Sequence, residues 1–198
     1  MSKRRVVVTG LGIISPVGNT IDHAWDSLMA GRSGITRISR FDPSAFACQI
    51  AGDVKDFDLA KYLTAKDARR MDTFIHYGLA AAIDAFKDSG LEVTESNRER
   101  IGVNIGSGIG GLQMIEETHK TYLADGPRKI SPFFIPATII NMISGHLSIM
   151  YGLQGPNVAM VTACTTGTHA VGEVGRMIEY GEADVMIAGG SESCICPL

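Results

Sequence analysis

Apolar and polar positions along this chain follow two alternating patterns. Short apolar runs have the length and composition of buried strands, at residues 5–8, 101–105, 158–162 and 184–188. The stretches between them repeat apolar residues every three to four positions, which predicts helices over residues 22–30, 64–89, 112–123, 138–150 and 165–180. Strands separated by helices predict an α/β fold, with a mainly parallel sheet and helices on its faces.

Local signals support these boundaries. Candidate caps of the first helix are Asn19, Thr20 and Asp22, and Thr64 can cap the long helix that runs to Ser89. Glycines follow most of the helices, at Gly31, Gly90, Gly152 and Gly181. Residues 41–58 lack a clear period, which predicts a loop with short strands. No linker rich in proline, glycine and serine divides the chain, so we treat residues 1–198 as one domain.

Composition excludes several classes of protein. The chain has 198 residues, of which 45% are hydrophobic and 20% charged, as in an ordinary globular domain. Its net charge of -3 gives no general attraction to nucleic acid or membrane, so an acidic partner needs a local basic patch. The first apolar run is too short for a signal segment or a membrane span, which predicts a cytoplasmic protein. Four cysteines without Cys-x-x-Cys or paired histidine spacing argue against a disulfide scaffold and against a metal site.

Cys164 is the candidate nucleophile. It follows the apolar run at residues 158–162 and opens the next helix, where unpaired backbone N–H groups and the helix dipole favour a thiolate and could hold an oxyanion. Gly167, Gly172 and Gly175 lower the helix propensity of this segment and indicate a flat helix face that meets other backbone closely. The alternative is a buried structural cysteine on a core helix.

Several segments carry a family resemblance. Thr162–Ala170 resembles the active-site segment of the beta-ketoacyl-acyl carrier protein synthases, the condensing enzymes of the thiolase superfamily. Six further segments resemble that family in the same order: Arg5–Gly12, Ser15–Gly18, Gly31–Ile35, Gly106–Gly111, Ile130–Pro136 and Asp184–Gly190. Within them, Ser131–Phe134 is closer to synthase II than to synthase I. The resemblance covers nearly the whole chain.

The resemblance implies a thiolase-like layered fold of two similar halves. This chain looks like most of the first half, so we expect it to be a truncated N-terminal portion of such a domain. The implied activity is a decarboxylative Claisen condensation that elongates fatty acids by two carbons, with acyl and malonyl thioesters on acyl carrier protein and with no cofactor. A homodimer is expected, without nucleic acid or membrane partners. Two histidines and a lysine of the family's site would lie in later segments.

The resemblance also implies roles for individual side chains. The acyl pocket would be shaped by Ile109, Phe134 and Thr138. Basic residues are candidate contacts for the acidic carrier protein, although each taken singly is more often a solvated helix end: Lys66, Arg69, Arg70, Arg128 and Lys129. His169 lies five positions beyond Cys164, about 140° round the helix, so it faces away from the thiol.

Gly106, Gly108 and Gly111 match a dinucleotide fingerprint that follows a strand and precedes a helix. The acidic residue that should close a second strand some 20 residues later is missing. We therefore favour the alternative, in which these glycines let a loop pass close to Cys164.

Two other functions remain open. One is a non-catalytic interaction partner, similar to the chain-length factors that pair with a synthase, and the presence of Cys164 counts against it because those proteins lack the cysteine. The other is a thiolase-type acyltransferase that uses CoA. The basic residues and Ser131–Phe134 favour carrier protein over CoA.

Overall fold

A three-stranded parallel sheet lies at the centre of this computed structural model, which describes residues 4–198. Its strands follow the order β4 (Asn157–Val158), β3 (Ile101–Gly106) and β5 (Val185–Gly190). β3 and β5 pair from the first residue of each to the last. Their carboxyl ends therefore meet at one edge, where parallel sheets commonly place binding and catalytic groups.

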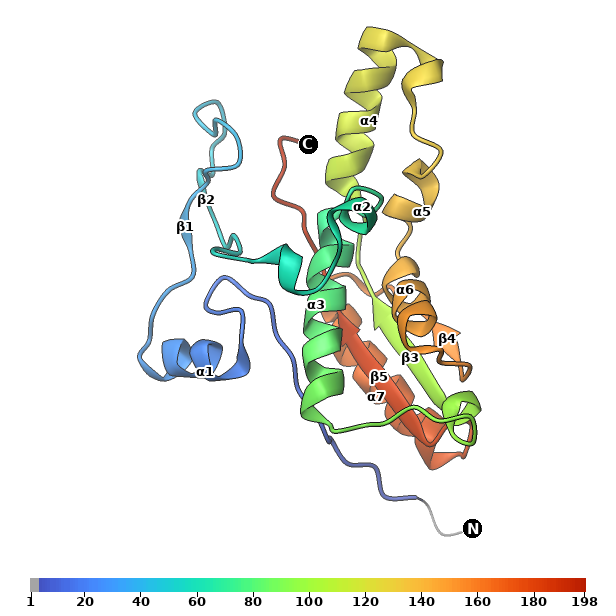
Figure 1. The fold of residues 1–198 in the computed structure, drawn as a ribbon. Coiled ribbons are helices and arrows are strands. Elements are labelled where there is room, and N and C mark those ends of the chain that lie inside the picture. The colour runs from blue at the N-terminus through green and yellow to red at the C-terminus, as the bar shows by residue number, and fades with distance from the viewer. Residues whose placement is uncertain (1–3) are drawn as a thin grey trace.

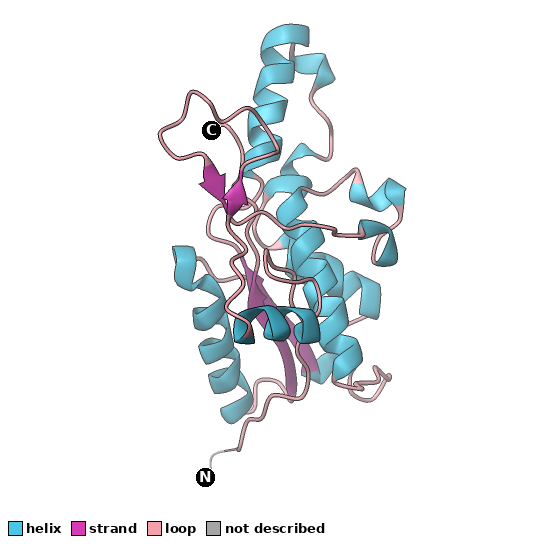
Figure 2. Ribbon diagram, turned by 90° about the vertical axis from the view of Figure 1, so that its left-hand side faces the viewer, coloured by secondary structure: helices cyan, strands magenta, loops and turns pink. Residues whose placement is uncertain are grey.

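Helices cover both faces of this sheet (Figures 1 and 2). α7 (Thr166–Glu179) packs on one face, while α3 (Thr73–Asp88) and α6 (Met142–Tyr151) cover the other. The hydrophobic core lies on the α3 side, where Phe74 and Leu79 have no exposed surface. The arrangement confirms the predicted parallel sheet with helices on its faces.

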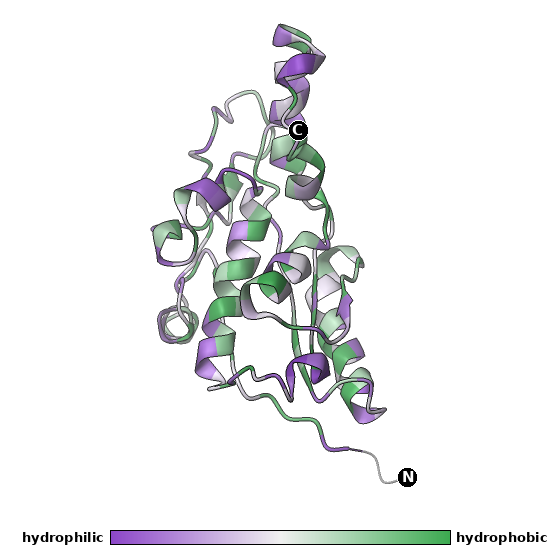
Figure 3. Ribbon diagram, turned by 45° about the vertical axis from the view of Figure 1, so that its right-hand side comes forward, coloured by the Kyte–Doolittle hydropathy of each residue, from purple (hydrophilic) through white to green (hydrophobic). Residues whose placement is uncertain are grey.

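Further elements complete the chain, namely α1 (Ile21–Met29), β1 (Thr36–Arg37), β2 (Ile50–Ala51), η1 (Leu59–Lys61), α2 (Ala65–Ala68), η2 (Arg98–Arg100), α4 (Leu112–Asp125), η3 (Pro127–Lys129), α5 (Phe134–Thr138) and η4 (Ala163–Thr165). β1 and β2 form a separate antiparallel pair. α4 and η3 form an arm that extends away from the sheet (Figure 1), and hydrophilic and hydrophobic residues are mixed along it (Figure 3). The structure confirms, to within two residues at each end, the helices and strands predicted at residues 22–30, 101–105, 112–123, 165–180 and 184–188.

The apolar run at residues 5–8 does not form the predicted buried strand. Its three valines are between 41% and 76% exposed, and no strand of the described chain pairs with them. The segment that follows lies against α3, where Leu11 donates its N–H to Asp88 Oδ2 at 2.9 Å. An apolar run becomes a strand only when a neighbouring backbone completes its hydrogen-bond ladder, and composition alone does not supply that neighbour.

One predicted helix is divided, and another starts later than predicted. The helix predicted over residues 64–89 is α2 followed by α3, because Asp72 starts a new helix by accepting a hydrogen bond from Phe74 N at 3.2 Å. The helix predicted over residues 138–150 starts late: Thr138 is the last residue of α5, Ile139 has an extended backbone, and α6 begins at Met142. The prediction placed a cap at Thr64 and none at Asp72, so it did not separate α2 from α3.

The strand predicted at residues 158–162 is shortened to β4 because a serine of α6 takes part in its ladder. The Ser144 hydroxyl accepts from Ile105 N at 3.0 Å and donates to Val158 O at 2.8 Å. These backbone groups would otherwise extend the pairing of β3 with β4. The chain is therefore free to turn before it reaches Cys164.

Candidate active site

Cys164 lies on a sharp turn between the sheet and α7. It is the middle residue of η4, and its free thiol is exposed. Ala163, immediately before it, has a φ of 51°, a left-handed conformation that residues other than glycine rarely adopt. The Thr166 hydroxyl holds this turn by donating to Ala163 O at 2.7 Å and accepting from Thr162 N at 3.0 Å. The turn therefore presents Cys164 at the start of the helix.

The glycine loop after β3 passes beside this turn. A Cβ on Gly108 would lie 3.2 Å from Ala163 Cα, and a Cβ on Gly106 would lie 2.0 Å from Met160 O. Glycine permits such approaches because it has no side chain. The geometry supports the interpretation that these glycines serve close passage near Cys164 rather than a dinucleotide.

Glu192 fills the backbone nest of the same loop. Its Oε2 accepts from Gly108 N at 2.7 Å and from Ile109 N at 3.1 Å. Its Oε1 accepts from Ser107 Oγ at 2.8 Å and from Gly110 N at 3.3 Å. Successive N–H groups that point at one anion are what a phosphate would require, and here a carboxylate of the protein uses them.

Sequence reasoning missed Glu192, although a signal for it exists. Gly106 and Gly190 pair at the carboxyl ends of β3 and β5, so the residues that follow each strand are brought together. An acidic residue shortly after one parallel strand and a glycine-rich loop after its neighbour therefore indicate this contact.

Cys164, Ile109, Glu192 and Cys194 line one cavity of about 550 Å³. Ile109 is half-exposed there, on the loop that Glu192 holds. The second thiol in this cavity has a different environment, because burial and then the Glu192 carboxylate raise the pKa of Cys194 to about 12. Cys194 therefore stays protonated at neutral pH, while Cys164 is the thiol exposed to solvent.

The other two predicted pocket residues lie on α5, next to the glycine loop. Thr138 is buried, and its carbonyl oxygen accepts from Gly111 N at 3.0 Å. Phe134 is the first residue of α5. Neither belongs to the lining of the Cys164 cavity in the described part of the chain, and their contact with an acyl chain stays a prediction.

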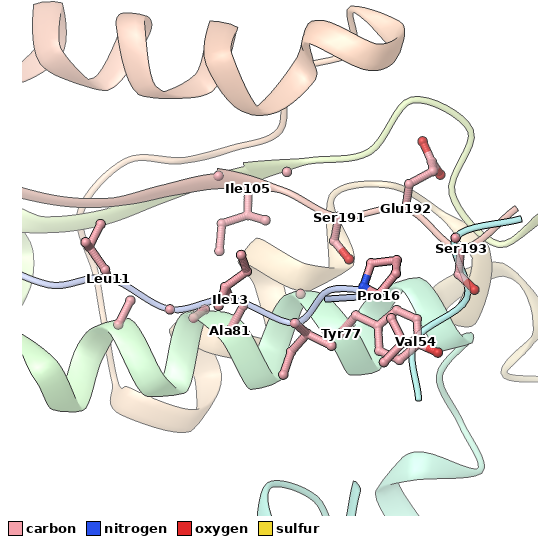
Figure 4. Close-up of a pocket in the computed structure, with 18 of the residues that line it drawn as sticks. Leu11, Ile13, Pro16, Val54, Tyr77, Ala81, Ile105, Ser191, Glu192 and Ser193 are labelled. Atoms are coloured by element: carbon pink, nitrogen blue, oxygen red, sulfur yellow. The ribbon is translucent and has the colours of Figure 1, made fainter. Parts of the chain in front are cut away.

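A second cavity, of about 460 Å³, lies between the N-terminal segment, α3 and the end of β5 (Figure 4). Figure 4 shows Ser191 and Ser193 pointing to the side of Pro16, whereas Glu192 points away from it. This alternation is that of an extended backbone. Glu192 lines this cavity as well, while its carboxylate is directed to the glycine loop.

The histidine nearest to Cys164 along the chain bonds elsewhere. His169 Nδ1 lies 3.3 Å from Thr162 Oγ1, on the turn that precedes Cys164. Among residues 4–198, no three His, Cys, Asp or Glu side chains gather as metal ligands would. Within the same residues, no helix combines the length and apolar character needed to cross a membrane.

The predicted basic residues fall into two places rather than one patch. Lys66, Arg69 and Arg70 are exposed on α2 and the turn after it, and the Arg70 guanidinium lies 4.3 Å above the Phe133 ring, beside α5. The other two, Arg128 and Lys129, are exposed on η3 at the far end of the arm (Figure 1). Their contact with a carrier protein stays a prediction.

Residues 3–198 match the family described as the beta-ketoacyl synthase N-terminal domain. The chain belongs to the beta-ketoacyl synthase family. A relative from Vibrio cholerae, 3-oxoacyl-(acyl-carrier-protein) synthase 2, is 60% identical over 198 residues, and one of the same name from Vibrio harveyi is 59% identical. Both alignments cover 100% of this chain and 48% of the relative, so the chain spans about half the length of these curated relatives. The family inferred from the motifs is confirmed.

Solved ketosynthases share the fold. The ishigamide ketosynthase/chain length factor superposes with a TM-score of 0.85 at 30% identity, over 98% of this chain and 48% of that chain. A ketosynthase in complex with its type II polyketide acyl-carrier protein superposes with a TM-score of 0.80 at 28% identity, over 98% of this chain and 52% of that chain. These likenesses confirm the thiolase-like layered fold.

Proposed function

We propose that the protein carrying this chain is a beta-ketoacyl-acyl carrier protein synthase that elongates fatty acyl chains. The observation that carries the proposal is the place of Cys164, a free thiol in η4, just before α7, and in one cavity with Ile109. Relatives that are 59–60% identical bear the name 3-oxoacyl-(acyl-carrier-protein) synthase 2, which supports condensation on a carrier protein.

The reaction has two steps, both of which use Cys164. First, its thiolate attacks the carbonyl carbon of an acyl thioester, a new S–C bond forms, and the bond from that carbon to the carrier sulfur breaks. The carrier leaves as a thiolate and takes up the proton that the Cys164 thiol had released. Second, a malonyl thioester loses carbon dioxide, and the resulting enolate carbon attacks the acyl group on Cys164. A C–C bond forms and the Cys164 thiolate leaves, which lengthens the chain by two carbons. Backbone N–H groups at the start of α7 can stabilise the oxyanion that develops in each step.

We infer that the acidic carrier protein docks on the exposed side chains Lys66, Arg69 and Arg70. The stacking of Arg70 on Phe133 supports this inference, because it ties the basic turn to the segment that leads into α5. The solved relative in complex with its acyl-carrier protein supports the class of partner. The distal site on the arm, Arg128 and Lys129, would contact a carrier protein separately.

We also infer a homodimer. α4 buries no residue, and large apolar side chains are exposed along the arm and α5: Ile115, Tyr122, Leu123, Ile130, Phe133, Ile135 and Ile139. Such surfaces mark interaction sites. Light scattering after gel filtration measures the oligomeric state, and lysine at Leu123 and Ile135 should shift a dimer to monomer. A wild type that is already monomeric contradicts the inference.

Intact-mass spectrometry after incubation with acyl-carrier protein tests the reaction. Wild type should gain the mass of one acyl group, and Cys164→Ala should gain none while keeping its circular dichroism spectrum. Cys48→Ala, which removes another exposed thiol, is the matched control and should be acylated as wild type is. Acylation that survives in Cys164→Ala refutes the proposed nucleophile. A wild type that is never acylated points to the non-catalytic partner, and preferential acylation by acyl-CoA points to the CoA-dependent transferase.

A further inference from the structure

The Glu192 anchor, which consists of Glu192 with Ser107, Gly108, Ile109 and Gly110, joins two segments that are distant in sequence. Hydrogen bonds of 2.7 to 3.3 Å from all four loop residues converge on one carboxylate. Three of the donors are consecutive backbone N–H groups and the fourth is the buried Ser107 hydroxyl. Charge-assisted bonds of this kind are roughly twice as strong as neutral ones. One side chain therefore accepts from four donors of the loop, where Gly110 N also donates to Ser107 Oγ at 3.0 Å.

The backbone that carries Glu192 is fixed to the core. Ser191 N donates to Gly106 O at 3.0 Å, and Ser191 Oγ donates to Phe74 O at 2.7 Å. Ser191 thus ties the segment to the end of β3 and to the start of α3. Because Ser191 and Glu192 point to opposite sides (Figure 4), the carboxylate reaches the loop from a rigid base.

The anchored loop carries the side chain that shares a cavity with the nucleophile. Ile109 N is one of the four donors, so a change in the carboxylate moves the backbone of Ile109 beside Cys164. We propose that Glu192 is a positioning residue: by holding the loop it sets where Ile109 stands, and so selects the length of acyl chain that reaches Cys164. This inference rests on the proposed function, in which Cys164 is acylated.

Hydrogen–deuterium exchange of the loop amides tests the anchor without any substrate. Because hydrogen bonds to a charged group are lost, exchange at Gly108 and Ile109 should rise about tenfold or more in Glu192→Ala. The rise at Gly110 should be smaller, because its N–H also donates to Ser107 Oγ at 3.0 Å. Glu192→Gln should give a smaller rise, since its one carbonyl oxygen can still accept. Glu99→Gln makes the same change at an exposed glutamate just before β3, at the opposite end of that strand, and should leave exchange in the loop unchanged.

Acylation by thioesters of different chain length tests the consequence for selectivity. In an otherwise unchanged protein, Ile109→Phe should lower acylation of Cys164 by long chains relative to short ones. The loss should be about 5- to 150-fold, the range that corresponds to overpacking a filled site. If Glu192 acts through the loop, adding Glu192→Ala to the Ile109→Phe variant should remove most of this discrimination between long and short chains. Acylation of Cys164 by short chains should remain. A residue that acts only on overall stability would lower both chain lengths equally.

Faster loop exchange together with lost discrimination supports the proposal. Unchanged exchange overturns it, and so does faster exchange with the Ile109→Phe discrimination intact. If Glu192→Ala does not fold, Glu192→Gln decides by the same two measurements, and failure of both variants to fold overturns the positioning role. A wild type that is not acylated refutes the proposed function instead, and the exchange experiment still decides whether Glu192 holds the loop.

Discussion

Asp72 connects three helices around the candidate site, and replacing it tests how that site is held. It is 3% exposed, its Oδ1 accepts from Phe74 N in α3 at 3.2 Å, and its Oδ2 accepts from Met114 N in α4 at 2.9 Å. Its own N–H donates to Ala137 O in α5 at 3.2 Å. Asp72→Ala removes the two carboxylate bonds and keeps the backbone bond.

The expected cost follows from these contacts. Loss of an N-cap costs about 1 kcal/mol. Loss of the second bond leaves the partly buried Met114 N–H without its acceptor, which costs about 1–3 kcal/mol. Burial is the main reason why the pKa of Asp72 is raised, so removing the buried charge offsets part of the sum. We expect Asp72→Ala to lower the free energy of unfolding by about 2–3 kcal/mol, and Asp72→Asn, which keeps one acceptor, by about 1 kcal/mol.

Urea denaturation followed by circular dichroism measures both losses. Asp58→Ala is the matched control, because Asp58 caps the short η1 by accepting from Ala60 N at 3.2 Å and is exposed. Its loss should stay near 0.5 kcal/mol, roughly the low end for a cap. If Asp72→Ala costs no more than Asp58→Ala, the carboxylate does not tie α3 to α4 and the reasoning is refuted.

Three other outcomes can be measured independently. Glutamate at both Lys66 and Arg69 should weaken carrier-protein binding more at low than at high salt, and equal affinity in titrations at two ionic strengths would contradict this. Hydrogen bonds from two guanidinium groups lower the pKa of Asp184 to about 2, so its stabilising contribution is complete above its unfolded pKa of 3.8 and is lost as pH falls toward 2. The stability difference between wild type and Asp184→Asn should shrink over that range in acid-unfolding curves. Iodoacetamide at neutral pH should label Cys164 and spare Cys194, whose pKa is about 12, as peptide mass mapping can show.

Much of the fold could be predicted from the sequence because its determinants are local. The buried strand at 101–105 and the helix at 165–180 are visible as periodic apolar patterns, and the structure has both. The approach of the glycine loop to the Cys164 turn could be inferred because glycine is required where backbones meet. The segments that resemble the beta-ketoacyl synthases then indicated the thiolase-like fold as a whole.

Contacts between distant segments could not be predicted in the same way. Asp72 divides a helix because its carboxylate caps α3 and reaches α4, and periodicity does not register either bond. Ser144 shortens β4 by inserting its hydroxyl between two strands. In the sequence alone, Glu192 looks like an ordinary exposed acidic residue. The pairing of β3 with β5 in the structure places it over the loop. Each side chain acts through a partner that only the tertiary structure supplies.

The separation along the chain between Glu192 and its loop has a consequence for folding. Gly108 and Glu192 are 84 residues apart, and Ser191 and Phe74 are 117 apart. Contacts of such separation form late, because the entropy of loop closure opposes them until the intervening elements pack. At about 5–20 residues per second, the ribosome needs roughly 1–6 s to travel from Cys164 to Glu192. A nascent chain therefore carries Cys164 for seconds before Glu192, whose carboxylate binds the neighbouring glycine loop, has been synthesised.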